Sequence, residues 1–300
     1  MSKLEKTFVI LYGSQKAGTT WLHRTLDQSE QFFGGHVKEW RFWPIYFSSP
    51  RAQAKHITEL EAKLASTKEK KRAHLQRLPA YADPEGFLKQ ITEQALERPN
   101  ARILADFSPA TGFRCTQNIP EIQQLMHGYG FDTKALWLIR DPVSRLLSSM
   151  TMQMKGGTLG HRDMTDKDPD QDYIRHVLEN AAQGLLFNQT RIDLIWDELM
   201  GLDVPAQVHH FDDLFSQSSV DQVTAFLGME SVPPFEQNPN KGHELFVSDD
   251  NKRFVARELA PTYRFFVNKM GSDGCPSRGG SRWPICEQAL GGAELFQWIG

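Results

Sequence analysis

The chain has 300 residues, with 34 basic and 37 acidic side chains and a formal net charge of −3. This length allows one large α/β domain or two small ones, with a sizeable core, and we expect one large domain. The balanced charge excludes a global positive field, so neither nucleic acid nor an anionic membrane is an expected partner. No segment has the roughly 20 apolar residues of a membrane span. The sequence has no signal-peptide pattern and only three cysteines, which favours a cytoplasmic protein, and a Cys275–Cys286 disulfide stays open.

Four short apolar runs alternate with longer helical patterns, at residues 7–12, 102–106, 134–139 and 204–210. This alternation predicts the strands of a mainly parallel central sheet flanked by helices, a three-layer α/β fold. The first and third runs lack polar alternation, as is typical of strands covered on both faces. Ligands of such sheets bind beyond the carboxyl ends of the strands. The loops after Tyr12, Asp106, Ile139 and His210 should therefore share one edge.

Helix signals lie between these runs. Residues 51–78 contain eight Lys or Arg against three Glu, which predicts a helix that either caps an acceptor site or presents a solvated face. Asp83 followed by Pro84 indicates the start of another helix, and residues 98–100 indicate its end. We expect a single domain over residues 1–270, with 51–100 as a helical insertion on the acceptor side. Residues 271–300 are expected to form a glycine-rich C-terminal extension.

Residues 13–20 read G-S-Q-K-A-G-T-T, between the first predicted strand and a helix that should begin at Thr19. Backbone N–H groups in such a glycine-bracketed loop, with the positive end of the helix, favour a bound anion. The loop is P-loop-like but departs from the nucleotide-hydrolysing pattern G-x-x-x-x-G-K-[ST]. Thr19 stands where that pattern has lysine, and Lys16 lies inside the loop. The motif predicts a phosphate-type cradle with a cation near the transferring end of a donor.

A second motif, L-I-R-D-P-V-S-R-L-L-S-S, covers residues 138–149 at the end of the third predicted strand. Arg140 leaves the strand at the binding edge, and its planar fork suits a phosphate group. Ser148, two turns into the following helix, can offer a hydroxyl to the same anion. Arg145 is expected to be a structural or surface residue.

Together, the two motifs resemble the donor-binding signature of sulfotransferases that use 3′-phosphoadenosine-5′-phosphosulfate (PAPS), in the same order and roughly 120 residues apart. In that family the first loop holds the 5′-phosphosulfate, and the arginine and serine of the second motif hold the 3′-phosphate. The resemblance implicates the following donor-binding residues: Lys16, Ala17, Gly18, Thr19, Thr20 and Trp21 at the 5′ end, Arg140 and Ser148 at the 3′ end, and Lys241 with Gly242 in a later N-K-G-H segment.

Three shorter segments extend the resemblance toward the heparan-type and related bacterial branch. V-K-E-W-R-F-W at 37–43 resembles its K-E-x-H-F-F segment, D-F-S-P-A-T at 106–111 its E-K-S-P-x-Y, and H-F-D-D-L at 210–214 its Y-E-D-L. Arg41, Phe107 and Thr111 replace the family's histidine, lysine and tyrosine, so the acceptor side need not follow the heparan enzymes. Arg41 and Ser108 are the candidate acceptor-binding residues. Arg41 could bind an acidic acceptor or the transferring sulfonate, and a solvated Arg41 is the alternative.

Sulfuryl transfer needs positioning and charge stabilisation more than covalent chemistry from the protein. The resemblance makes Glu39 the catalytic base, and Lys16 the cation that stabilises the leaving phosphate, with the 3′,5′-bisphosphate (PAP) as product. Trp40, Phe42 and Trp43 could form an apolar wall that raises the pKa of Glu39, although Lys38 would oppose that shift. No metal is expected, because no His/Cys/Asp cluster has zinc spacing.

Alternative assignments of the base and of the function stay open. His36 or His210 could be the base in place of Glu39, and Lys241 could belong to an ordinary turn. A nucleotide-dependent kinase is the alternative enzyme, for which Asp106 would have to hold magnesium. A non-catalytic nucleotide-binding protein is the third possibility. The acceptor is expected to be a saccharide or a small molecule carrying a hydroxyl or amine, in a bacterial cytoplasmic setting.

Overall fold

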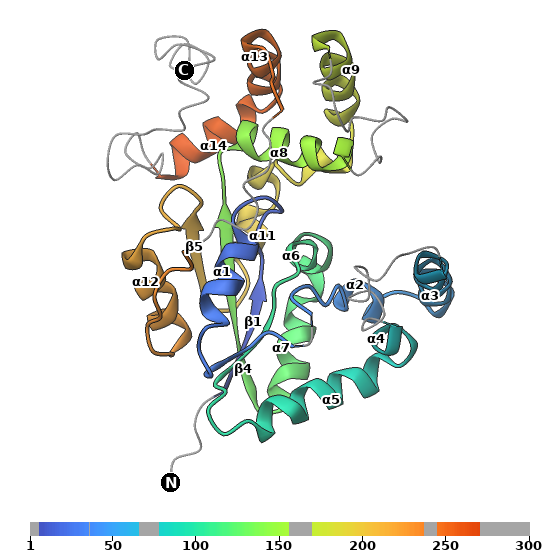
Figure 1. The fold of residues 1–300 in the computed structure, drawn as a ribbon, viewed down its shortest axis with the longest axis vertical. Helices are drawn as coiled ribbons and strands as arrows, with labels where there is room; N and C mark the ends of the chain where they lie inside the picture. The colour runs from blue at the N-terminus through green and yellow to red at the C-terminus, as the bar shows by residue number, and fades with distance from the viewer. Residues whose placement is uncertain (1–5, 36, 66–77, 156–169, 237–244, 271–300) are drawn as a thin grey trace. The chain divides into compact units, whose positions relative to one another are not determined.

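The structure is a computed structural model that describes residues 6–35, 37–65, 78–155, 170–236 and 245–270. The chain forms two units, and each is described by itself (Figure 1). Unit 1 takes in residues 1–13, 18–139 and 200–239, and unit 2 takes in residues 14–17, 140–199 and 240–300. The domain boundaries expected from the sequence, 1–270 and 271–300, stay predictions.

Unit 1 contains a five-stranded sheet in the order β2-β3-β1-β4-β5, in which every neighbouring pair is parallel. The strands are β1 (Lys6–Leu11), β2 (Phe32–Phe33), β3 (Ile103–Asp106), β4 (Phe131–Ile139) and β5 (Ala206–His210). All four predicted strands are present. Central β1 is fully covered, with Phe8 through Leu11 at 0 % exposure, as its unbroken apolar run predicts.

Helices flank this sheet in unit 1 (Figure 1). The helical elements of unit 1 in the described residues are α1 (Thr19–Leu26), α2 (Trp43–Tyr46), α3 (Pro50–Ala65), α4 (Leu78–Ala82), α5 (Pro84–Glu97), α6 (Pro109–Cys115), the 3-10 turn η2 (Thr116–Asn118), α7 (Ile119–Gly128) and α12 (Gln217–Leu227). The predicted α/β fold, a mainly parallel sheet flanked by helices, is confirmed.

Helix α5 begins as its sequence predicts. The Asp83 side chain accepts a hydrogen bond from Gly86 N at 2.9 Å, and Pro84 occupies the first helical position. Helix α3 covers residues 50–65 of the charged stretch, and residues 66–77 of that stretch lie outside the described part. Most of the side chains of α3 between Pro50 and Glu61 are exposed, and Leu60 is buried. This pattern fits a solvated face and leaves the capping role a prediction.

Unit 2 is helical in its described residues. It holds α8 (Pro142–Lys155), α9 (Gln171–Ala181), α10 (Leu185–Asn188), the 3-10 turn η3 (Ile192–Leu194), α13 (Asp249–Glu258) and α14 (Ala260–Met270), while α11 (Trp196–Met200) runs to the boundary with unit 1. The helix predicted to follow Arg140 is present as α8, which starts at Pro142. The buried Asp141 accepts hydrogen bonds from Ser144 N at 2.7 Å and from the Tyr263 hydroxyl at 2.8 Å. Tyr263 thereby ties α14 to the start of α8.

Candidate active site

The carboxyl ends of the parallel strands meet at one edge of the sheet in unit 1. The register pairs Ile10 with Asp106, Leu11 with Leu136 and Ile139 with His210, so the four strands end toward the same edge, with β4 and β5 running three residues past the level of Leu11. The predicted common edge is therefore present. Segments that follow these strands are where a ligand of this fold class binds.

Helix α1 starts at this edge with a glycine in place of a side-chain cap. Gly18 has φ 86°, and a methyl group there would lie 2.5 Å from Leu214 Cδ2, so the position requires glycine. The first helical bond runs from Leu22 N to Gly18 O. The N–H groups of the first turn, including those of Thr19 and Thr20, have no acceptor within the helix. With no acidic residue in that turn, the helix start suits an anion.

Trp21, predicted to contact the donor, is anchored within unit 1. Its Nε1 donates to the carbonyl of Phe235 at 2.9 Å, its ring packs edge-on against Phe215, and only 4 % of the residue is exposed. The Trp21 side chain holds α1 in place, so any donor contact at this position would come from its backbone.

Loop residues 14–17 belong to unit 2, and arginine side chains hold their carbonyl groups. Arg140 Nη1 donates to Lys16 O at 3.0 Å, and Arg145 Nε donates to Gln15 O at 3.1 Å. Lys16 has φ 76°, a left-handed conformation that is unusual for a side chain larger than asparagine, and Ala17 N donates to Ser14 O at 3.2 Å. Two consecutive carbonyls are thus fixed by guanidinium groups, which determines the shape of the loop.

Arg145 is structural, which was one of its two expected roles. It is 1 % exposed, and its fork also donates to Thr190 Oγ1 at 2.6 Å and Gln189 Oε1 at 2.9 Å. Burial lowers the pKa of Arg145 to about 10. Ser148, on α8, is half-buried, as is Arg140. The role of these two residues at a 3′-phosphate stays a prediction.

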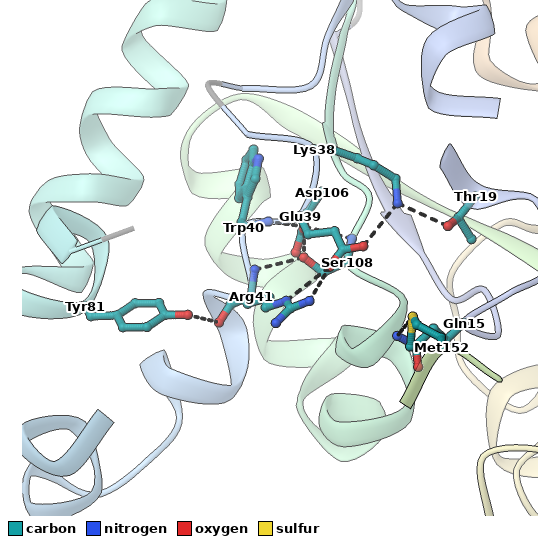
Figure 2. Close-up of polar contacts among 10 residues, drawn as sticks. All are labelled: Gln15, Thr19, Lys38, Glu39, Trp40, Arg41, Tyr81, Asp106, Ser108 and Met152. Atoms are coloured by element: carbon teal, nitrogen blue, oxygen red, sulfur yellow. Dashed lines mark hydrogen bonds and ion pairs between the residues drawn. The ribbon is translucent and has the colours of Figure 1, made fainter. Parts of the chain in front are cut away.

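A chain of ionic contacts in unit 1 centres on Glu39 (Figure 2). Lys38 Nζ lies 3.2 Å from Glu39 Oε1 and donates to Thr19 Oγ1 at 3.1 Å. Arg41 binds the other carboxylate oxygen, Glu39 Oε2, through Nη2 at 2.8 Å and Nε at 3.1 Å. The predicted base is therefore held between two cations, one of which also contacts the first residue of α1.

The expected rise in the pKa of Glu39 is wrong. Burial raises this pKa, but the charges of Lys38 and Arg41 and their hydrogen bonds outweigh burial and leave the pKa below its usual value. Glu39 is accordingly ionised at neutral pH, the state that a general base requires.

Asp106 connects the Glu39 segment to the end of β3. Its carboxylate has no exposed surface and accepts hydrogen bonds from Trp40 N at 3.2 Å, Ser108 N at 3.0 Å, Ser108 Oγ at 2.5 Å and Thr111 Oγ1 at 3.1 Å. Burial raises the pKa of Asp106 to about 6, although these hydrogen bonds oppose the shift. Through these hydrogen bonds, Asp106 fixes the position of the segment around Glu39 and of the residues that follow β3.

Ser108 and Arg41 were the predicted acceptor-binding residues. Ser108 is fully buried, and its hydroxyl donates to Asp106 and accepts from Arg41 N at 2.8 Å. This geometry favours a role in positioning Arg41 over direct contact with an acceptor. Arg41 has φ 53° and an exposed side chain that is paired with Glu39. Its guanidinium borders solvent beside the predicted base.

Of the two alternative bases, His210 and His36, the described residues include only His210. Burial lowers the pKa of His210 to about 4 with the charge of His209 adding to the effect, so His210 is neutral but weakly basic at pH 7. His36, Lys241 and Gly242 lie outside the described residues, as do Cys275 and Cys286.

Among the residues that the structure describes, no group of three His, Cys, Asp or Glu side chains could hold a metal ion. Within the same segments, none of the helices combines the length and hydropathy needed to cross a bilayer.

Sequence reasoning did not assign a role to Lys38, and it considered Asp106 only as a magnesium ligand. The adjacency of Lys38 to Glu39 was visible in the sequence, but its bond to Thr19 joins segments 19 residues apart. The D-x-S pattern at 106–108 was a usable signal for Asp106, since a serine two residues after an aspartate commonly bonds its carboxylate. Both residues belong to the candidate site as the structure defines it.

Solved structures of two sulfotransferase domains align with nearly the whole of this chain. The sulfotransferase domain from the curacin biosynthetic pathway has a TM-score of 0.43 and 18 % sequence identity, over 96 % of this chain and 98 % of that domain. The sulfotransferase domain from the Synechococcus PCC 7002 olefin synthase has a TM-score of 0.39 and 17 % identity, over 99 % and 97 %. No curated protein matches the sequence significantly. The profile of the sulfotransferase family matches residues 9–207, and the chain therefore belongs to the sulfotransferase family.

Proposed function

We propose that this sulfotransferase moves a sulfonate group from PAPS to a hydroxyl or amine of a saccharide or small-molecule acceptor. The observation that carries the proposal is the ion-paired Glu39, linked through Lys38 to Thr19 at the start of α1. A carboxylate that can take a proton is thereby connected to a helix start that favours an anion. The resemblance of both donor motifs to the PAPS-dependent branch supports the identity of the donor.

In the proposed reaction, Glu39 accepts the proton of the acceptor hydroxyl as the acceptor oxygen forms a bond to sulfur. The bond from sulfur to the bridging phosphate oxygen breaks, and PAP leaves with both of that bond's electrons. Lys16 stabilises the charge on the leaving oxygen. Arg140 and Ser148 recognise the 3′-phosphate, with Lys241 and Gly242 as further donor contacts. No metal takes part in this scheme.

The base assignment is tested with Glu39→Gln, which keeps the size of the side chain but cannot accept the proton. We expect at least a 100-fold loss of kcat with labelled PAPS, and unchanged affinity for PAP. Glu93→Gln, at an exposed carboxylate of α5, is the matched control. Unchanged turnover in Glu39→Gln would exclude Glu39 as the base. The acceptor is found by screening sugars, phenols, amines and alcohols with the labelled donor.

Donor recognition is tested by comparing PAP with adenosine 5′-phosphate. Recognition of the 3′-phosphate predicts that PAP binds at least tenfold more tightly, and that Arg140→Gln and Ser148→Ala reduce this preference. Equal affinity for the two nucleotides would refute the role of both residues.

The kinase alternative finds no support at Asp106. Its carboxylate is buried and occupied by hydrogen bonds from Trp40, Ser108 and Thr111, so it does not offer the open oxygen ligand that magnesium needs. The composition and the small number of cysteines are the basis for proposing a cytoplasmic bacterial enzyme. A glycan precursor or a specialised metabolite is the acceptor class that fits such a setting.

A further inference from the structure

The Lys38 ammonium group occupies the position between the helix start and the base. Figure 2 shows the side chain pointing between Thr19 and Glu39, with Nζ 3.1 Å from Thr19 Oγ1 and 3.2 Å from Glu39 Oε1. A group that passes from a donor at α1 to an acceptor held by Glu39 has to cross this interval. Lys38 is therefore the described cation that touches both ends of the transfer path in unit 1.

The ammonium has capacity for another acceptor. A lysine carries three N–H donors, and the described residues supply two acceptors for Lys38, one from Thr19 and one from Glu39. The side chain is 19 % exposed, so one side of it is open. Burial lowers the pKa of Lys38, whereas the carboxylates of Glu39 and Asp106 oppose that shift and favour the charged form.

The backbone around Lys38 is fixed on both sides. Phe107 N donates to Lys38 O at 3.2 Å, and Trp40 N donates to the buried Asp106 carboxylate at 3.2 Å. The segment 38–40 is thus tied to the end of β3 by two hydrogen bonds. This leaves the four-carbon side chain of Lys38 as the adjustable part, which can follow an oxygen atom over a short path.

We propose that Lys38 is a further catalytic residue that binds a non-bridging oxygen of the sulfonate while it is transferred. This rests on the proposed function. As sulfur moves from the leaving phosphate oxygen to the acceptor oxygen, a non-bridging sulfonate oxygen accepts the third N–H of Lys38, beside the two that Thr19 and Glu39 accept. Lys38 keeps all its protons, and the acceptor proton goes to Glu39. The ammonium offsets the negative charge of the sulfonate, which the leaving phosphate oxygen and the acceptor oxygen both contact during the transfer.

The test compares a ligand that carries the sulfonate with one that lacks it. The dissociation constants of PAPS and PAP are measured without acceptor for the wild type, Lys38→Met and Lys38→Arg. We expect Lys38→Met to weaken PAPS at least tenfold more than PAP, and Lys38→Arg to restore part of the difference. Lys89→Met, at an exposed lysine of α5, is the matched control, because it makes the same substitution where no donor contact is proposed. It should leave the ratio of the two constants unchanged.

Each other outcome has a defined meaning. If Lys38→Met changes the two constants by the same factor, or changes neither, Lys38 does not contact the sulfonate and this inference is wrong while the proposed function stands. If the wild type binds neither nucleotide, the proposed function itself is wrong, and the inference falls with it. Thermal unfolding of each variant confirms that the chain is folded in the binding assay.

Discussion

Replacing Asp106 with asparagine should change how stability depends on pH. The pKa of Asp106 is about 6 in the folded chain, against 3.8 for an ordinary aspartate. Between these values the unfolded chain releases a proton that the folded chain retains. The contribution of this group to stability is thus full below about pH 4 and is lost as pH rises through 6. About two pKa units correspond to about 3 kcal/mol.

The magnitude is measured as the difference between Asp106→Asn and the wild type. Three histidines, the buried His209 and the half-buried His23 and His210, have pKa values lowered to about 4. They add stability as pH rises and mask the Asp106 effect in the wild type alone. Burial also raises the pKa of Asp141. The three histidines and Asp141 are present in both the wild type and Asp106→Asn. Their contributions to the free energy of unfolding therefore cancel in the difference between the two proteins.

Urea unfolding followed by tryptophan fluorescence at pH 4, 5, 6 and 7 provides the free energies. We expect the stability of Asp106→Asn relative to the wild type to rise by about 2.5 kcal/mol between pH 4 and pH 7. Asp203→Asn, at an exposed carboxylate, is the matched control. A stability difference between Asp106→Asn and the wild type that does not change with pH would refute the reasoning, because it would mean that Asp106 titrates alike in the folded and unfolded states.

Three further substitutions test other parts of the structure. Gly18→Ala should cost about 2 kcal/mol in thermal unfolding, because of its φ of 86° and the nearby leucine methyl; Gly228→Ala, with φ 77° and open space around it, should cost about half as much. Tyr263→Phe should lower the free energy of unfolding by about 1–3 kcal/mol through the lost bond to buried Asp141. Arg145→Lys should weaken PAP and adenosine 5′-phosphate by the same factor, about tenfold, since it loosens the loop without touching a 3′-phosphate; a loss confined to PAP would contradict this.

The elements that the sequence predicted well are those with strong local signals. The run at 8–11 is apolar throughout and becomes the central strand, and Asp83 before Pro84 marks the start of α5. Strand β2 was missed, because Phe32 and Phe33 are too short a run to show a period, and only their pairing with β3 makes them a strand.

The candidate site was predictable in its residues but not in its interactions. Glu39 was recognised from the motif around it, yet the direction of its pKa depends on how close Lys38 and Arg41 come, and the sequence contains no distances. The hydroxyl of Ser108 is similar: the motif indicates an important residue, but only the fold shows that the group points at Asp106 and not at open space. Chemistry at a site depends on such geometry as much as on residue type.

The parallel sheet has a consequence for synthesis on the ribosome. Thr7 of β1 pairs with Ile103, and Lys6 pairs with Phe131, so the first strand has no partner until about 95 more residues have been made. At about 5–20 residues per second, this delay is on the order of 5–20 s. Residues 8–11, which are fully covered in the finished sheet, stay exposed for that time. The nascent chain should therefore depend on chaperones that bind unfolded segments, or on fast translation, until β3 has been made.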